Sequence, residues 1–196
     1  MVKTLPSYGL SSLKKPKLDS KQKNKKKEGR AMKIIKIFKE TISDGFGFRY
    51  SIYFSGCTHY CEGCHNQETW KGDIGRLLDS EYMNEIVGDI NSNYMLDGIT
   101  LSGGDPFFNP KELLEFLIEI KAKTNKNIWS YTGYTYETLL KDPTMRECLN
   151  YIDVLVDGKF QKANYHPDLY FRGSSNQRII DIKKSIKNNE IITLKF

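Results

Sequence analysis

The sequence predicts an α/β fold in the form of a partial (βα) barrel with about five or six mostly parallel strands. Short β-branched and aromatic runs alternate with amphipathic helical patterns, which is typical of βα units around a parallel sheet. Fewer strand patterns can be found than the eight of a complete barrel. The 196 residues, 39% of them apolar, are enough for one well-cored domain and too few for two large ones.

Six short runs account for the predicted strands. All are bounded by polar or turn-forming residues, and most are rich in Val, Ile, Tyr, Phe or Trp. In chain order they are residues 34–38 (a possible extra edge), 50–54, 98–101, 127–131, 152–156 and 191–194. We expect these runs to form one mostly parallel sheet.

Two helices are predicted between these strands. Ser80 is expected to cap the first, in which apolar side chains recur at i, i+3, i+4 and i+7 from Met83. The second should begin at Pro110 after Asn109, with Glu112 three residues beyond the cap. The apolar faces of both helices are expected to cover the sheet.

The positive charge of the chain is concentrated at its amino terminus. Residues 1–30 contain ten Lys or Arg against Asp19 and Glu28, a balance of +8, whereas residues 31–196 carry 20 basic and 22 acidic side chains. We expect residues 1–31 to be a basic, disordered extension, because its Lys-rich run lacks apolar periodicity. The body lacks the basic bias of a nucleic-acid-binding protein, so a nucleic-acid partner is not expected.

The chain shows no pattern of a secretory signal or of a membrane span. No apolar region follows the amino-terminal charges, and no stretch approaches the roughly 18 consecutive apolar residues that a span requires. We therefore expect a cytoplasmic protein without a membrane partner. Thiols stay reduced there, and clustered cysteines more often bind metal than form disulfides.

Three cysteines share one short segment at the spacing C-x3-C-x2-C: Cys57, Cys61 and Cys64. If three thiolates hold a [4Fe-4S] cluster, one iron keeps an open coordination position, which is typical of a catalytic metal site. A Cys3His zinc site that includes His59 or His65 is an alternative on spacing alone. Cys148, far along the chain in a helical pattern, is expected to be a buried thiol.

Polar or glycine-rich segments directly follow four of the predicted strands. They are the cysteine segment and residues 102–106, 132–134 and 157–159. The carboxyl ends of parallel strands share one edge of a sheet, where ligand sites are built. Gly103 and Gly104 would let the backbone approach a ligand, and Asp105 offers a carboxylate to an ammonium group. A convergent site of this size favours the cluster over zinc.

Seven segments match a known family: DGFGFR (44–49), FSGC (54–57), CEGCHN (61–66), LSGGDP (101–106), WSYTGY (129–134), DVLVDGKF (153–160) and RGSSNQR (172–178). In these segments the chain resembles radical S-adenosylmethionine (SAM) enzymes. Within that superfamily it closely resembles the activating enzymes of anaerobic (class III) ribonucleoside-triphosphate reductases. The resemblance covers about residues 33–180, and the last two segments select the subgroup. The chain departs from the family at Phe46, where proline is usual.

The resemblance implies a [4Fe-4S] cluster held by Cys57, Cys61 and Cys64 in a radical SAM domain of residues 32–196. It implies that S-adenosyl-L-methionine is cradled by two segments: Gly63, Cys64 and His65, and Ser102, Gly103, Gly104 and Asp105. The implied reaction is reductive cleavage of SAM to a 5′-deoxyadenosyl radical, which generates a glycyl radical on the large subunit of the reductase. A reduced donor such as flavodoxin would supply the electron.

Two other functions stay open on the sequence. An activating enzyme of a formate-lyase type of glycyl-radical enzyme would share the cysteine segment through residues 64–66. A zinc-binding interaction module would use its basic extension to contact nucleic acid. Residues 172–178 would either dock a protein partner or close the rim of the barrel.

Overall fold

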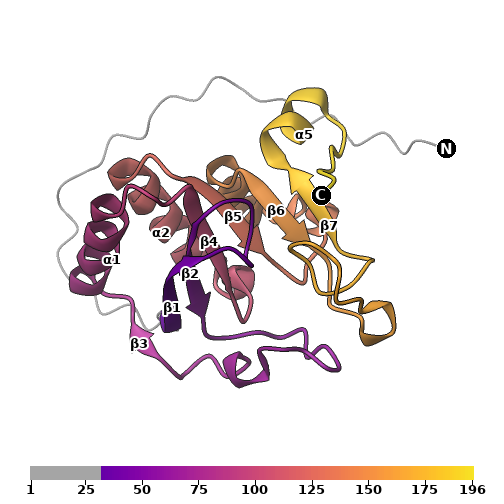
Figure 1. Cartoon of the computed structure of the whole chain (residues 1–196), viewed down its shortest axis with the longest axis horizontal. Coiled ribbons are helices and arrows are strands. Elements are labelled where there is room, and N and C mark those ends of the chain that lie inside the picture. Colours follow the sequence, from indigo (N-terminus) through magenta and orange to yellow (C-terminus); the bar gives the residue numbers. More distant parts are fainter. Residues whose placement is uncertain (1–31) are drawn as a thin grey trace.

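A mixed sheet of seven strands organises residues 32–196, the part of the chain that the computed structural model describes (Figure 1). The strand order is β3-β1-β2-β4-β5-β6-β7. In chain order the strands are β1 (Lys33–Thr41), β2 (Arg49–Phe54), β3 (Arg76–Leu77), β4 (Gly98–Gly103), β5 (Asn127–Tyr131), β6 (Val154–Asp157) and β7 (Arg178–Asp181). The expected disordered extension, residues 1–31, lies outside the described residues.

The sheet has a parallel centre and antiparallel sides. β2, β4, β5 and β6 are parallel to one another, whereas β1 and β7 run antiparallel to the central strand that each borders. β3 pairs antiparallel with β1, and the sheet is open between β3 and β7. The predicted α/β class is thus confirmed, but the sheet has more strands than predicted, and three of its six strand pairings are antiparallel.

The carboxyl-terminal part of the sheet differs from the prediction. Residues 191–194 do not form a strand; they make an isolated bridge between Thr193 and Ile180. The strand that closes this side is β7, which the sequence analysis missed. β7 has only four residues and comes directly after a polar segment, so its sequence carries little apolar signal.

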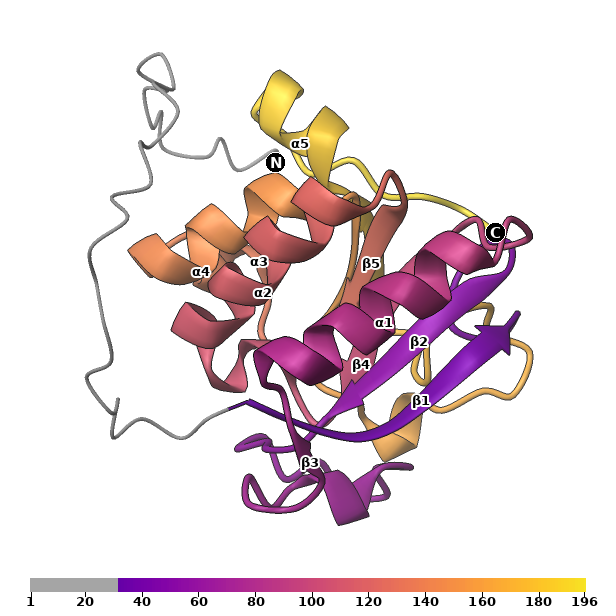
Figure 2. The ribbon, with the colours of Figure 1, turned by 90° about the vertical axis from the view of Figure 1, so that its left-hand side faces the viewer.

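Five α-helices occur in residues 32–196: α1 (Ser80–Ser92), α2 (Pro110–Lys123), α3 (Tyr136–Leu139), α4 (Pro143–Cys148) and α5 (Ile182–Asn188). Single-turn 3₁₀ helices span Gln67–Thr69, Pro106–Phe108, Leu149–Tyr151 and Lys162–Asn164. α1 and α2 cover the same face of the sheet (Figure 2). None of the described helices has both the length and the apolar character needed to cross a bilayer.

The helix starts show which capping predictions hold. α2 begins at Pro110 as predicted. The cap of α1 is Asp79 and not Ser80, because Asp79 has the extended backbone and its carboxylate accepts a hydrogen bond from the Tyr82 N–H at 2.8 Å. Cys148 ends α4 and is buried, as expected.

Alternation along the strands divides the core between the two faces of the sheet. Ile128 and Leu155 point into the main core, which α1 and α2 cover with Ile86 and Leu117. The neighbouring residues on the same strands point to the other face, where Trp129, Val154, Val156 and Ile179 form a smaller cluster. Apolar side chains therefore hold both faces of the central strands in place.

A fully buried arginine ties the central strands together at their amino ends. Arg49 donates to Ile99 O at 2.6 Å, to Asn127 Oδ1 at 2.7 Å and to Thr100 Oγ1 at 3.0 Å. Burial lowers its pKa to about 10, so it stays charged at neutral pH. These bonds join β2, β4 and β5 at the edge of the sheet opposite to the predicted site.

Candidate functional site

The four loops predicted to share one edge of the sheet lie at that edge. Each is bonded to a neighbouring loop or strand end through its backbone. Asp105 N–H donates to Gly56 O at 2.8 Å, Thr132 N–H to Val156 O at 3.0 Å, and Gly158 N–H to Tyr134 O at 2.9 Å. This arrangement follows from the parallel order of β2, β4, β5 and β6.

The three cysteines of the C-x3-C-x2-C segment lie in the loop after β2. Cys57 is 7% exposed, whereas Cys61 and Cys64 are half-buried. Burial raises the pKa of Cys57 to about 11, and the nearby Asp105, Cys61 and Cys64 add to this rise. Burial also raises the pKa of Cys61. A thiolate at Cys57 or Cys61 is therefore costly unless an iron or another cation takes the place of its proton.

Neither histidine of the loop is arranged as a zinc ligand. His59 is bonded to Asp105, and the His65 ring packs against the rings of Phe160 and Tyr165 at centroid distances of 5.5 and 5.8 Å. Within residues 32–196, no three His, Cys, Asp or Glu side chains, the three cysteines included, are grouped so that they could hold one metal ion. The contacts of the two histidines give no support to the Cys3His alternative.

Asp105 is a buried carboxylate that joins three of the loops. Its Oδ2 accepts from His59 Nε2 at 2.6 Å, Thr132 Oγ1 at 3.0 Å and Gly133 N–H at 3.0 Å. Its Oδ1 accepts from Phe107 N–H at 2.9 Å. The family resemblance implies that Asp105 contacts the cofactor, and this stays a prediction. The structure shows in addition that it fixes the cysteine loop to the loops after β4 and β5.

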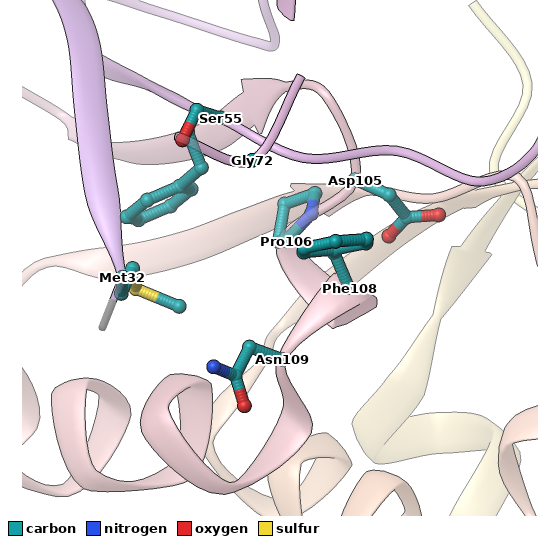
Figure 3. Close-up of a pocket in the computed structure, with 8 residues that line it drawn as sticks. Met32, Ser55, Gly72, Asp105, Pro106, Phe108 and Asn109 are labelled. Atoms are coloured by element: carbon teal, nitrogen blue, oxygen red, sulfur yellow. The ribbon is translucent and has the colours of Figure 1, made fainter. Parts of the chain in front are cut away.

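A small pocket lies behind this carboxylate, between the amino end of β1 and the loop after β4. Its volume is about 10 Å³, and its lining includes Met32, Ser55, Gly72 and Phe108. Figure 3 shows that Asp105 turns its carboxylate away from Met32 and this pocket. The Oδ2 atom of Asp105 is therefore free of the pocket and bonds to His59 of the cysteine loop and to Thr132 and Gly133 after β5.

Gly104 brings the loop after β4 into backbone contact with the cysteine loop. A Cβ at this position would lie 2.4 Å from the carbonyl oxygen of Gly56, closer than any side chain could approach. The glycine pair was expected to give a ligand access to the backbone. The structure adds a second reason for glycine at position 104, because a side chain there would keep the two loops apart.

Gly133 gives a testable case of the same kind, because a Cβ there would lie 2.3 Å from the His59 ring. We expect Gly133→Ala to force His59 away from Asp105 and to lower the free energy of unfolding by about 1–3 kcal/mol, the usual cost of overpacking. Denaturant unfolding of the full chain under anaerobic conditions measures this loss.

Gly88→Ala is the matched control, because a Cβ at Gly88 on α1 meets nothing within 4 Å. We expect it to raise the free energy of unfolding by about 0.5–1 kcal/mol through helix propensity. Equal stability of Gly133→Ala and the wild type would contradict the close contact with His59.

A larger cleft of about 810 Å³ opens on the same edge, beside His59. Arg178 lines it and forms ion pairs with Asp157 at the end of β6 and with Glu137 of α3, the latter at 2.8 Å. The bonds from Arg178 hold the pKa of Glu137 at about 2. Lys159 also lines the cleft. A cleft of this size suits a small organic ligand.

Residues 172–178 fold back on themselves beside this cleft. Gln177 Oε1 accepts from the N–H groups of Gly173 and Ser174, at 2.9 and 3.1 Å. Arg172 Nη1 donates to Gln177 O at 2.9 Å. Arg178, the last residue of the segment that was predicted to dock a partner or to close the rim, lines the cleft.

Comparison with known families assigns a cofactor to the cysteine loop. Residues 43–180 match the family model described as a 4Fe-4S single cluster domain. This range contains all three cysteines and every loop of the site. The chain is thus an iron–sulfur enzyme, and three buried or half-buried thiols on one loop fit the ligand set of such a cluster.

Curated relatives define the enzyme more narrowly. The chain is 40% identical over 152 residues to the anaerobic ribonucleoside-triphosphate reductase-activating protein of Haemophilus influenzae, with 76% of this chain and 97% of the relative covered. The proteins of the same name from Enterobacteria phage T4 and Escherichia coli are 36% and 38% identical. The matched regions cover 76% and 69% of this chain, and 93% and 90% of the two relatives. This chain belongs to the family of anaerobic ribonucleoside-triphosphate reductase-activating proteins, which confirms the resemblance stated above.

Proposed function

We propose that this enzyme reductively cleaves S-adenosylmethionine and generates a glycyl radical on the anaerobic ribonucleoside-triphosphate reductase. The observation that carries the proposal is the loop of Cys57, Cys61 and Cys64 at the carboxyl edge of the sheet, in a chain whose match covers 97% of a reductase-activating relative. Three thiolates leave one iron of a [4Fe-4S] cluster without a protein ligand. That iron is where SAM would bind.

The residues proposed to hold SAM lie on two adjacent loops. Gly63, Cys64 and His65 belong to the cysteine loop, and Ser102, Gly103 and Gly104 end β4 directly beside it. The backbone contact at Gly104 and the carboxylate of Asp105 keep these two loops in register. The role of the chain is thus to present two fixed backbone segments to the cofactor.

When bound, the reduced cluster would supply the electron that splits SAM into methionine and a 5′-deoxyadenosyl radical, which takes a hydrogen atom from a glycine of the reductase. The protein would limit side reactions by burial: Cys57 is 7% exposed, and the His59 side chain beside it is 8% exposed. A dry site protects a reactive intermediate from solvent. The cleft beside His59 would admit the glycine-bearing segment of the partner.

We further propose that residues 32–196 form a partial (βα) barrel of the radical SAM type. The four parallel strands support this proposal, and the antiparallel β1 and β7 would form its sides. The partner would be the large subunit of the reductase, and the electron would come from a reduced donor such as flavodoxin. We place the reaction in the cytoplasm, where the thiols stay reduced before the cluster forms.

The test is formation of the glycyl radical. The reconstituted, reduced enzyme is mixed anaerobically with SAM and with the reductase, or with a formate-lyase type of glycyl-radical enzyme as the control. We expect an electron paramagnetic resonance signal of a glycyl radical with the reductase only. A signal only with the control enzyme would assign a different partner, and no cleavage of SAM with the reductase bound would refute the proposed reaction.

A further inference from the structure

A second concave surface lies at the β7 side of the sheet, outside the cysteine loop and the cleft beside His59. It is a groove of about 600 Å³, which we call the β7 groove, formed by residues 168–175, residues 193–196 and the start of β7. Figure 1 shows the end of the chain beside β7 on this side of the molecule. Ile179 in its lining is 3% exposed, whereas Tyr170 is 64% exposed. An exposed tyrosine beside a groove is typical of protein–protein interfaces.

The segment of residues 193–196 presents an open backbone edge to this groove. The carbonyl oxygen of Ile192 and the N–H group of Leu194 are bonded to β7 at 2.9 and 2.7 Å. Since backbone groups of successive residues point to opposite sides of an extended chain, the N–H and C=O groups of Thr193 point away from β7. Within residues 32–196, neither group has a hydrogen-bond partner. Such an edge can pair with a further strand.

The β7 groove also carries positive charge that the described chain leaves unpaired. Arg172 and Lys195 line the groove, and neither forms an ion pair with a described residue. Arg172 is bonded only to the backbone carbonyl of Gln177, at 2.9 Å. Asp168 is the carboxylate among the described lining residues, and it lies 3.6 Å from His166 Nδ1 with its side chain 87% exposed. An acidic ligand segment would therefore complement the groove.

The β7 groove is continuous with the cleft beside His59, because Arg178 lines both. Arg178 begins β7 and pairs with Asp157, the last residue of β6, so it marks the carboxyl edge of the parallel strands. Residues 193–196 run antiparallel to β7 and therefore lead toward Arg178. A strand added to their outer side would be directed to the cleft and to the cysteine loop.

We propose that the β7 groove binds an extended, acidic segment of the reductase that flanks its glycine. The segment pairs with the backbone edge at Thr193, and its carboxylates bind Arg172 and Lys195. In strand addition the backbone bonds supply affinity, and side-chain contacts supply specificity. The inference rests on the proposed function, since it takes the reductase as the partner. It adds that the partner is held on the β7 side of the cleft, apart from the cofactor.

Hydrogen exchange of the wild type tests the strand addition without any substitution. The reconstituted full chain is exchanged anaerobically with and without the reductase, and electron-transfer fragmentation resolves single amides. The amide of Thr193 has no partner in the free protein, so it should exchange rapidly. We expect the reductase to slow this exchange at least several-fold. Protection in the cleft at residues 133–138 with none at Thr193 would overturn the proposal.

Two pairs of variants test the edge and the charge separately, with the affinity for the reductase as the measurement. Thr193→Pro removes an N–H group that bonds nothing within the described chain, and Thr193→Ala is its control. Lys195→Glu reverses a charge in the groove, and Lys141→Glu reverses an exposed charge outside it. We expect Thr193→Pro and Lys195→Glu to weaken binding at low salt at least about threefold and the controls to bind like the wild type.

The outcomes separate this inference from the proposed function. Wild-type affinity in both Thr193→Pro and Lys195→Glu would overturn the role of the β7 groove, while binding of the wild type would still support the reductase as partner. Equal weakening by Lys195→Glu and Lys141→Glu would show a general effect of charge and overturn the role of Lys195. No binding of the reductase by the wild type would refute the partner and the groove together.

Discussion

Cys57→Ala is expected to abolish cluster binding and SAM cleavage. The thiol is buried at the start of the cysteine loop, three residues after the end of β2, and two remaining cysteines cannot supply the ligand set. Mutation of a residue that hydrogen-bonds to a metal ligand typically lowers metal affinity or activity by about 10–100-fold. Removal of a ligand itself should therefore lower cluster binding and SAM cleavage by more than about 100-fold. The measurements are iron content after anaerobic reconstitution and the yield of 5′-deoxyadenosine by chromatography.

Cys148→Ala is the matched control for this variant. Cys148 is also buried, burial raises its pKa to about 12, and its Sγ lies 3.5 Å from Pro110 O on the helical side of the sheet. We expect it to lose some stability but to keep the iron and the cleavage activity. Full iron loading and full cleavage by Cys57→Ala would refute the cluster assignment of this cysteine.

Asp105→Ala is expected to give the largest loss of stability among the site variants. It removes the acceptor for Thr132 Oγ1, for the N–H groups of Gly133 and Phe107, and for His59. Removing one partner from a buried, hydrogen-bonded charge network costs about 3–5 kcal/mol. Denaturant unfolding of the full chain should show this decrease.

Two further variants test whether the loss of stability comes from the hydrogen bonds of Asp105. Asp105→Asn keeps the shape but has only one acceptor oxygen, so we expect an intermediate loss. Asp168→Ala removes a carboxylate that is 87% exposed and should change the free energy of unfolding by less than about 0.5 kcal/mol. A loss below about 1 kcal/mol for Asp105→Ala would contradict its role in joining the loops.

The centre of the fold could be predicted from the sequence because its signals are local. β2, β4 and β5 are buried runs with flanking turns, and α2 begins at a proline after a capping residue. The two-residue β3 and the short, half-polar β7 have no such signal, because the strands beside them determine their pairing. The cap of α1 is Asp79 and not the predicted Ser80, because both residue types are suitable caps and it is Asp79 that has the extended backbone.

The same contrast between local signals and long-range contacts applies to the candidate site. The order of the parallel strands was enough to predict that four loops meet at one edge. It could not reveal that His59 and Asp105, 46 residues apart, form a bonded pair, or that Arg178 pairs with Glu137 over 41 residues. Polar partners that the fold alone brings together leave no spacing pattern in the sequence.

The bonds of Asp105 also have a consequence for the order of events during protein synthesis. The cysteines leave the ribosome first, but the loop that holds them is fixed by Asp105, which in turn is bonded to Thr132 and Gly133. Gly133 follows Cys64 by 69 residues, and translation at about 5–20 residues per second takes about 3–14 s to add them. During this interval the nascent chain exposes three free thiols without their support. We therefore expect iron and sulfide to be delivered after translation has passed β5, and an oxidant to do most damage before that point.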